Sequence, residues 1–219
     1  MKRLILFTLL LAAVPCVQAA ESAEAMVPAL VAQAPGLKPD VLKLALRAER
    51  TAASKGLVRR PNLLTVIDYS LPSTQPRLFV FDLVAKKLLF RELVAHGRNS
   101  GDNFTSFFSN NPNSLATSLG LFVTADPYVG GNGLSLRLKG LEHGFNDMAW
   151  DRMIVLHGAA YVSNAVIKAL GRLGRSWGCP AVRPEVAQKI IGTIRGGSAV
   201  FAYYPDPNWL SSSSFLHRG

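Results

Sequence analysis

Two side chains in the last third of the sequence have the types and the spacing for nucleophilic catalysis. Cys179 lies in the segment GRSWGCPAV (174–182), and His157 ends the apolar run RMIVLHG (152–158), 22 positions earlier. An unperturbed thiol is only slightly ionised at neutral pH, so a cysteine nucleophile needs a neighbouring base or cation. We therefore examine His157 as the base and Cys179 as the nucleophile.

The elements around these residues predict that they meet. The run ending at His157 is typical of a buried strand that carries the histidine to the rim of a sheet. The helical segment VSNAVIKALGR (162–172) and a loop then lead back to Cys179. Gly178 allows a sharp turn, and its backbone N–H, together with that of Cys179, is a candidate oxyanion donor.

Other residues near this pair are weaker candidates for contacting a substrate. Ser176 orders the loop through its hydroxyl or faces the substrate, and Trp177 is an aromatic wall or a packed indole. His96 and His143 both precede a glycine and fit turn or capping roles as well as binding roles. His217 lies in a polar terminal segment and is expected to be solvated.

The N-terminus predicts export. Residues 1–20 contain Lys2 and Arg3, an apolar run and the small-residue sequence Val17-Gln18-Ala19, which together are typical of a cleaved signal peptide. The apolar run is too short to span a bilayer, so no stable membrane anchor is expected after cleavage. Cleavage also removes Cys16, which leaves Cys179 as a lone thiol in an oxidising compartment. The alternatives are lipidation of Cys16 and an inert, buried Cys179.

The pattern of apolar residues predicts a mainly β domain with accessory helices, an α+β arrangement. A linker and one helix (39–55) are expected in residues 21–58, a catalytic domain in 59–206 and a flexible tail in 207–219. Predicted strands cover residues 63–71, 77–83, 87–97, 120–125, 134–140, 152–158 and 198–205, and a further helix covers 183–197.

Charge limits the partner classes. The chain has 24 basic and 14 acidic residues, and 22 basic residues remain after signal cleavage, which leaves a charge of +8. A basic surplus favours an anionic partner such as a cell-wall polymer. No Lys/Arg-rich run, zinc-finger spacing or aromatic RNA-binding motif is present, so nucleic acid is not expected. His157 and Cys179 lack two further ligands at recognisable spacing, so neither a metal nor another cofactor is expected.

The segments LRLKGLEHGFNDMAWDRMIVLHGAAYVS (136–163), RSWGCPAV (175–182) and SLGLFVT (118–124) resemble the YkuD-type murein L,D-transpeptidase catalytic domain family, in a divergent branch. The resemblance runs from about residue 63 to residue 205. It implies a β-sandwich of the L,D-transpeptidase type with a few helices and a lid over the cysteine.

The resemblance also implies a reaction in a periplasmic or wall-associated location. Cys179 would attack peptidoglycan stem tetrapeptides between the diamino acid at position 3 and D-alanine at position 4, with His157 as general base. An amine of a neighbouring stem would resolve the thioester to give a 3-3 cross-link. Gly178 and Cys179 would supply oxyanion donors; Ser176, Trp177, Gly158, His96 and Tyr128 are the expected substrate-binding residues.

The sequence departs from the family pattern at two places. Trp177 replaces the family's second histidine, and the spacing from His157 to Ser176 is longer than usual. We therefore keep three alternatives: an L,D-carboxypeptidase, in which water resolves the thioester; attachment of a lysine-ended wall protein; and a non-catalytic, secreted wall-binding module. Papain-like and NlpC/P60-like peptidases place cysteine before histidine in the chain, which counts against them.

Overall fold

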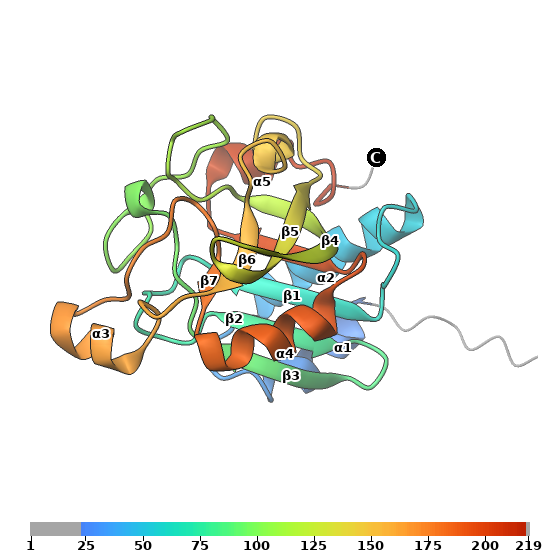
Figure 1. Ribbon diagram of the computed structural model, residues 1–219. Helices are drawn as coiled ribbons and strands as arrows, with labels where there is room; N and C mark the ends of the chain where they lie inside the picture. Colours follow the sequence, from blue (N-terminus) through green and yellow to red (C-terminus); the bar gives the residue numbers. More distant parts are fainter. Residues whose placement is uncertain (1–22, 218–219) are drawn as a thin grey trace, which may run out of the picture.

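The computed structural model describes residues 23–217, and the predicted signal peptide lies outside this range. Eight strands form one mixed sheet in the order β3-β2-β1-β8-β4-β5-β6-β7 (Figure 1). Two of the strand pairs, β1·β8 and β6·β7, are parallel. The strands are β1 (Leu63–Asp68), β2 (Leu78–Asp82), β3 (Lys87–Glu92), β4 (Gly120–Gly130), β5 (Gly133–Gly140), β6 (Val155–Gly158), β7 (Ala181–Val182) and β8 (Ala199–Tyr203).

The mainly β class with accessory helices is confirmed. The predicted strands at 63–71, 77–83 and 87–97 form an antiparallel meander of β1, β2 and β3, and those at 120–125 and 134–140 form the β4–β5 hairpin. The helices are α1 (Ala23–Val31), α2 (Pro39–Ser54), α3 (Asn164–Leu170), α4 (Pro184–Ile194) and α5 (Pro207–Ser212), with short 3-10 turns η1 (Arg98–Ser100) and η2 (Asp147–Ala149). None of the helices described in residues 23–217 is long and apolar enough to cross a membrane.

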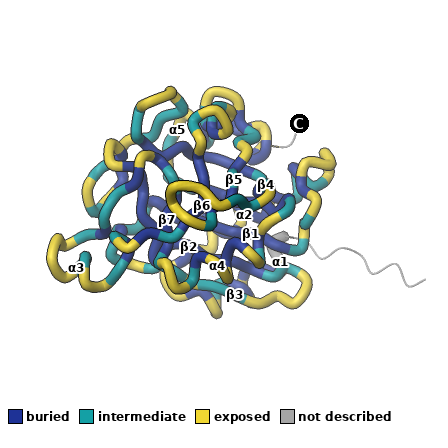
Figure 2. Tube along the Cα trace, viewed as in Figure 1, coloured by how far each residue is buried: buried dark blue, intermediate teal, exposed yellow. Residues whose placement is uncertain are grey.

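Local sequence explains where the main helices begin and end. Pro39 and Pro184 occupy the first turns of α2 and α4, where a missing backbone N–H costs nothing. Ser163 caps α3 by accepting a hydrogen bond from Val166 N–H (3.3 Å), and Gly171 ends that helix in the left-handed conformation (φ 68°). None of the residues of α3 is buried, so this helix is an exposed connection between β6 and the cysteine loop (Figure 2).

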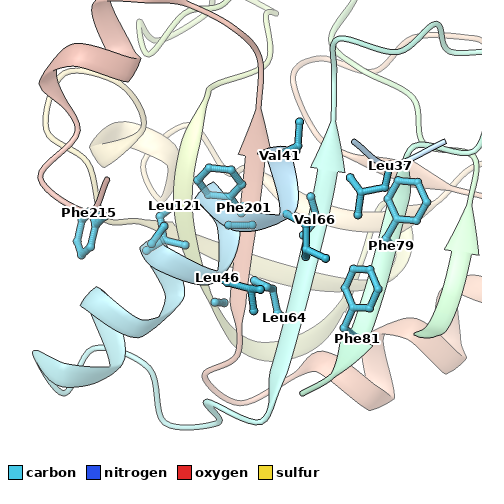
Figure 3. Close-up of a cluster of buried hydrophobic side chains, with 14 of the residues drawn as sticks. Leu37, Val41, Leu46, Leu64, Val66, Phe79, Phe81, Leu121, Phe201 and Phe215 are labelled. Atoms are coloured by element: carbon cyan, nitrogen blue, oxygen red, sulfur yellow. The ribbon is translucent and has the colours of Figure 1, made fainter. Parts of the chain in front are cut away.

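The curved sheet has an apolar core on each of its two faces. On one face, α1 and α2 pack against residues such as Leu64, Val66 and Phe201 (Figure 3). On the opposite face, α4 packs against residues of β1, β2, β5, β6 and β8 (Figure 1). This second core therefore includes strands from both halves of the curved sheet. Because β6 belongs to this second core, the strand that carries His157 is rigidly supported.

Two predictions for the chain ends were wrong. Residues 23–31 form α1, whose Met26, Val27 and Leu30 are buried, rather than a loosely packed arm. Residues 207–217 are not a loose tail, because Trp209 is fully buried and its Nε1–H donates to Glu142 Oε2 (2.9 Å). Apolar side chains from both ends of the described chain therefore pack on the face of the sheet that α1 and α2 cover.

Candidate active site

The connection from β6 through α3 to β7 brings the histidine and the cysteine to one sheet edge. β6 and β7 are parallel neighbours, with His157 opposite Ala181. Cys179 lies two residues before Ala181, and His157 N–H donates to the carbonyl of Pro180 (3.4 Å). The strand–helix–loop excursion therefore returns the chain beside its starting point.

His157 and Cys179 line one cleft of about 500 Å³ at this edge. The cleft is bounded by β4, the turn between β4 and β5, β6 with its flanking segments, and the cysteine loop. Its lining residues are Tyr128, Gly131, Asn132, Arg152, Met153, Val155, His157, Tyr161, Arg175, Ser176, Trp177 and Cys179. No carboxylate is among these residues of the described chain, whereas two arginines are.

The Cys179 thiol is half-buried against the segment that enters β6. Val155 N–H donates to Sγ (3.5 Å), and the thiol donates to the carbonyl of Met153 (3.8 Å). Burial raises the pKa of Cys179 above its usual range; the Val155 N–H and the Arg152 charge oppose this effect. The thiol is therefore neutral at neutral pH.

The His157 ring is buried (3% exposed) and oriented by the backbone. Its Nδ1 lies 3.0 Å from the carbonyl oxygen of Gly158, which can only accept, so Nδ1 carries the proton and donates. This tautomer leaves Nε2 as a base. Burial lowers the pKa of His157, and the bond to Gly158 opposes this effect, so the imidazole is neutral as well. Catalytic hydrogen bonds often shorten only when substrate binds, so the bonding of the thiol to Met153 is compatible with a neutral Cys–His pair.

The cysteine loop is ordered by the Ser176 hydroxyl, which is one of the two roles considered for this residue, and the bonding corrects the prediction for Gly178. The hydroxyl of Ser176 donates to the carbonyl of Cys179 (2.6 Å) and accepts from Gly178 N–H (3.1 Å). Ser176 lines the cleft but is only 5% exposed, and its hydroxyl braces the loop. Gly178 N–H is consequently occupied and is not a free oxyanion donor. Cys179 N–H donates to no group in the described residues.

His96 does not reach the cleft, which corrects a further prediction. The ring is buried between Arg77 Nη2 (2.7 Å from Nδ1) and the carbonyl of Gly101 (3.3 Å from Nε2). Burial and the Arg77 charge lower the pKa of His96 to about 4, so the ring stays neutral. The backbone of His96 supports the site instead, because its carbonyl accepts from Ser176 N–H (2.9 Å).

The remaining predicted residues occupy different positions. Trp177 is 73% exposed on the cleft rim, and Tyr128 lines the cleft with Arg137 over its ring (5.3 Å to the centroid). Gly158 lies outside the cleft lining. A Cβ at Gly158 would come within 3.0 Å of Ala187 Cβ on α4, so this glycine permits close helix–sheet packing.

Arg152 is the cleft residue that sequence reasoning missed. Its guanidinium donates to acceptors in the segment 109–118 while lining the cleft with Cys179. The sequence gives one signal, an arginine directly before the apolar run of β6. Its acceptors lie more than thirty positions earlier in the chain, and no local pattern predicts that contact.

The comparisons with known proteins identify the family of this chain. A family model described as L,D-transpeptidase catalytic domain (YkuD_2) matches residues 33–203. No curated protein sequence matches the chain.

Solved structures similar to this chain include an L,D-transpeptidase from Mycobacterium smegmatis, with 13% identity, a TM-score of 0.40, and 65% of this chain and 59% of that chain covered. L,D-transpeptidase 1 from Mycobacterium tuberculosis has 13% identity and a TM-score of 0.37, with 65% and 62% covered. The helical cell shape determining protein Pgp2 from Campylobacter jejuni has 12% identity and a TM-score of 0.44, with 66% and 48% covered.

The chain thus spans less than two thirds of the length of each of these solved proteins. The family model matches a larger part of this chain than the solved structures do. It begins at residue 33, so it includes α2, and it contains both His157 and Cys179. Because residues 33–203 make up well over half of the sequence, the chain belongs to the L,D-transpeptidase catalytic domain family.

Proposed function

We propose that this chain is a peptidoglycan L,D-transpeptidase in which Cys179 is the nucleophile and His157 the general base. The arrangement of these two side chains supports the proposal. A thiol and a neutral imidazole line the same cleft, and Gly158 holds the imidazole in the tautomer whose Nε2 is a base.

Acylation uses the groups in this cleft. Sγ of Cys179 attacks the carbonyl carbon between residues 3 and 4 of a stem tetrapeptide, and its proton passes to His157 Nε2. The negative charge on the carbonyl oxygen is met by Cys179 N–H, which donates to no other described group. The C–N bond then breaks, the imidazolium returns its proton to the leaving amine, and D-alanine departs from a thioester.

Deacylation repeats these steps in reverse with a different nucleophile. The side-chain amine of a second stem gives up a proton to His157 and attacks the thioester carbon, which releases the thiol and forms the 3-3 cross-link. Water in place of the amine gives a tripeptide, the L,D-carboxypeptidase outcome. A lysine-ended wall protein would use the same site with its own amine.

The charge of the cleft suits an anionic stem peptide. Arg152 and Arg175 line it, and no Asp or Glu does so within the described residues. A positive cleft attracts the carboxylates of the stem, including that of the terminal D-alanine. Export to the periplasm or the wall, with removal of residues 1–20, completes the proposal.

The products distinguish the reactions. Folded, reduced protein is incubated with a defined disaccharide-tetrapeptide, and the products are identified by mass spectrometry, with Cys179→Ala as the matched control. We expect loss of D-alanine and dimers joined 3-3 with the wild-type protein only. Tripeptide alone would assign the carboxypeptidase, and no loss of D-alanine would favour the non-catalytic wall-binding module.

A further inference from the structure

The segment that enters β6 wraps around the thiol. Met153 has a left-handed backbone (φ 55°), and this turn directs its carbonyl to the Cys179 Sγ. Val155 N–H approaches the same sulfur at 3.5 Å. Arg152 directly precedes Met153 and lines the same cleft as Cys179, so its guanidinium lies beside the cysteine loop.

Four acceptors hold the Arg152 guanidinium in place. Nη1 donates to the Ser109 carbonyl (2.7 Å) and to Ser118 Oγ (2.5 Å). Nη2 donates to Ser114 Oγ (3.1 Å) and to the Ala116 carbonyl (2.6 Å). All four acceptors are neutral, so they fix the group without cancelling its charge.

The charge of Arg152 is directed at the cysteine loop. A Cβ at Gly178 would lie 3.3 Å from Arg152 Nη2 and 2.8 Å from the Ala116 carbonyl that Nη2 binds. No salt bridge of the described chain includes Arg152, whereas Arg175, the other arginine of the cleft, is paired with Asp102 (2.9 Å). Arg152 thus places an uncompensated positive charge behind the Gly178–Cys179 peptide.

The other groups around the sulfur do not supply such a charge. His157 is neutral, because burial lowers its pKa, and burial also keeps Tyr69 and Tyr161 protonated by raising the pKa of each phenol. Trp177 stands where the family pattern has a second histidine and carries no charge. The titratable and charged residues that line the cleft with Cys179 are Tyr128, Arg152, His157, Tyr161 and Arg175, and the buried Tyr69 also interacts electrostatically with Cys179.

We propose that Arg152 is the positioning residue whose fixed positive charge stabilises the Cys179 thiolate in this chain. The inference rests on the proposed function, in which the thiolate forms during attack as the thiol proton passes to His157. Arg152 neither gives nor receives a proton. It lowers the free energy of the charged sulfur, and its anchors in the segment 109–118 keep it in register with the cysteine loop.

Alkylation of Cys179 by iodoacetamide tests this role without peptidoglycan, because the rate follows the thiolate fraction. The full chain is labelled between about pH 7 and about pH 9, where the thiol is only partly ionised, and modification is read on the peptide that contains Cys179. We expect Arg152→Met to slow labelling roughly tenfold, the effect of a shift of about one pH unit. Arg152→Lys, which keeps the charge, should stay within about threefold of wild type.

Two matched variants keep the result interpretable. Lys168→Met removes an exposed positive charge from α3, which has no contact with the cleft, and should leave the rate unchanged. The pair Ser114→Ala and Ser118→Ala frees two of the four anchors while retaining the charge. If Arg152→Met fails to fold, this pair decides the question, and we expect it to slow labelling by about threefold.

The inference is overturned if folded Arg152→Met is labelled as fast as Lys168→Met, or, where Arg152→Met does not fold, if the serine pair is labelled at the wild-type rate. An increase in the KM for tetrapeptide with unchanged labelling would mean that Arg152 binds substrate carboxylate, which also overturns it. If wild-type protein released no D-alanine from tetrapeptide, the proposed function would be refuted. The labelling rates would still show whether Arg152 stabilises the thiolate.

Discussion

At the scale of single residues, the chemistry depends on a neutral histidine beside a neutral thiol. Burial moves the two pKa values in opposite directions, down for His157 and up for Cys179. A buried pair in this state avoids the cost of two charges before substrate binds. In the proposed mechanism His157 accepts the proton during attack, and the Gly158 carbonyl stabilises the imidazolium that forms.

This arrangement predicts the acid limb of the pH profile. Because the pKa of His157 lies below the usual 6.5, the imidazole remains a base at mildly acid pH. We expect kcat/KM for D-alanine release to fall only below pH 6.5, as the His157 ring becomes protonated. His157→Gln should lower kcat/KM by roughly 10²- to 10⁴-fold. An acid limb above pH 6.5 would contradict a buried, neutral His157.

Sequence reasoning pointed to the two residues that line the cleft in the proposed mechanism, His157 and Cys179, but not to the groups that hold them. The apolar run before His157 and the glycine before Cys179 are local signals, so they were readable. The prediction for His96 was wrong because its ring is buried against the Arg77 guanidinium, which lies 19 positions earlier in the chain, and against the Gly101 carbonyl. Arg152 was missed for the same reason, since its acceptors belong to another segment.

At the scale of elements, the cysteine loop is held where three segments cross. Gly97, Ala116 and Gly178 meet backbone to backbone: a Cβ at Gly97 would lie 2.9 Å from Gly178 Cα and 2.6 Å from the Leu115 carbonyl. Gly97 N–H donates to Thr117 Oγ1 (2.8 Å), which ties two of these segments together. This crossing lets the stretch 98–119, which lacks regular strands, position the active-site loop.

The crossing predicts a strong effect of one added methyl group. Gly97→Ala should displace the Gly178 backbone, because all three atoms that the methyl group would meet belong to the main chain. We expect a loss of about 1–3 kcal/mol of stability from overpacking and at least a roughly 10²-fold loss of activity from the displaced thiol.

Gly192→Ala is the control for this substitution. Gly192 lies in α4, and a Cβ there meets no atom within 4 Å. The alanine should add roughly 0.5–1 kcal/mol to the free energy of unfolding, because it is the better helix former. Chemical denaturation measures both variants, and equal stability and activity of the two would argue against the crossing.

At the scale of the whole molecule, both ends of the described chain cover the same face of the sheet. Residues of α1, α2 and α5 share one core, although α5 lies far from the other two helices in the sequence. The helical periodicity of residues 39–55 predicted α2 correctly, since that pattern is local. The packing of Trp209 was not predictable, because it depends on Glu142 and on a core formed by distant segments.

This core contains a buried acid that links folding to pH. Glu49 on α2 is 2% exposed, its Oε1 has no hydrogen-bond partner in the described residues, and burial raises its pKa from 4.5 to about 7. The folded state thus binds the proton more tightly than the unfolded state. The stabilisation by the protonated Glu49 is complete below the pKa that this carboxyl has in the unfolded chain. It is lost as the pH rises through about 7.

Glu49→Gln should therefore stabilise the protein mainly at alkaline pH. We expect a gain of up to about 3 kcal/mol in the free energy of unfolding well above the raised pKa, and a difference within about 1 kcal/mol at acid pH. Glu185→Gln, at an exposed position of α4, should change stability by less than about 0.5 kcal/mol throughout. Urea denaturation across this pH range would show a constant difference if Glu49 were ionised in the core.

The central claim is that Cys179 carries the acyl group. The most direct measurement mixes disaccharide-tetrapeptide with a molar excess of folded, reduced protein and quantifies released D-alanine together with the tripeptide acyl group on the Cys179 peptide by mass spectrometry. We expect both in equal amounts before deacylation with wild-type protein, and neither with Cys179→Ala. Release of D-alanine by Cys179→Ala, or an acyl group on any other residue, would contradict it.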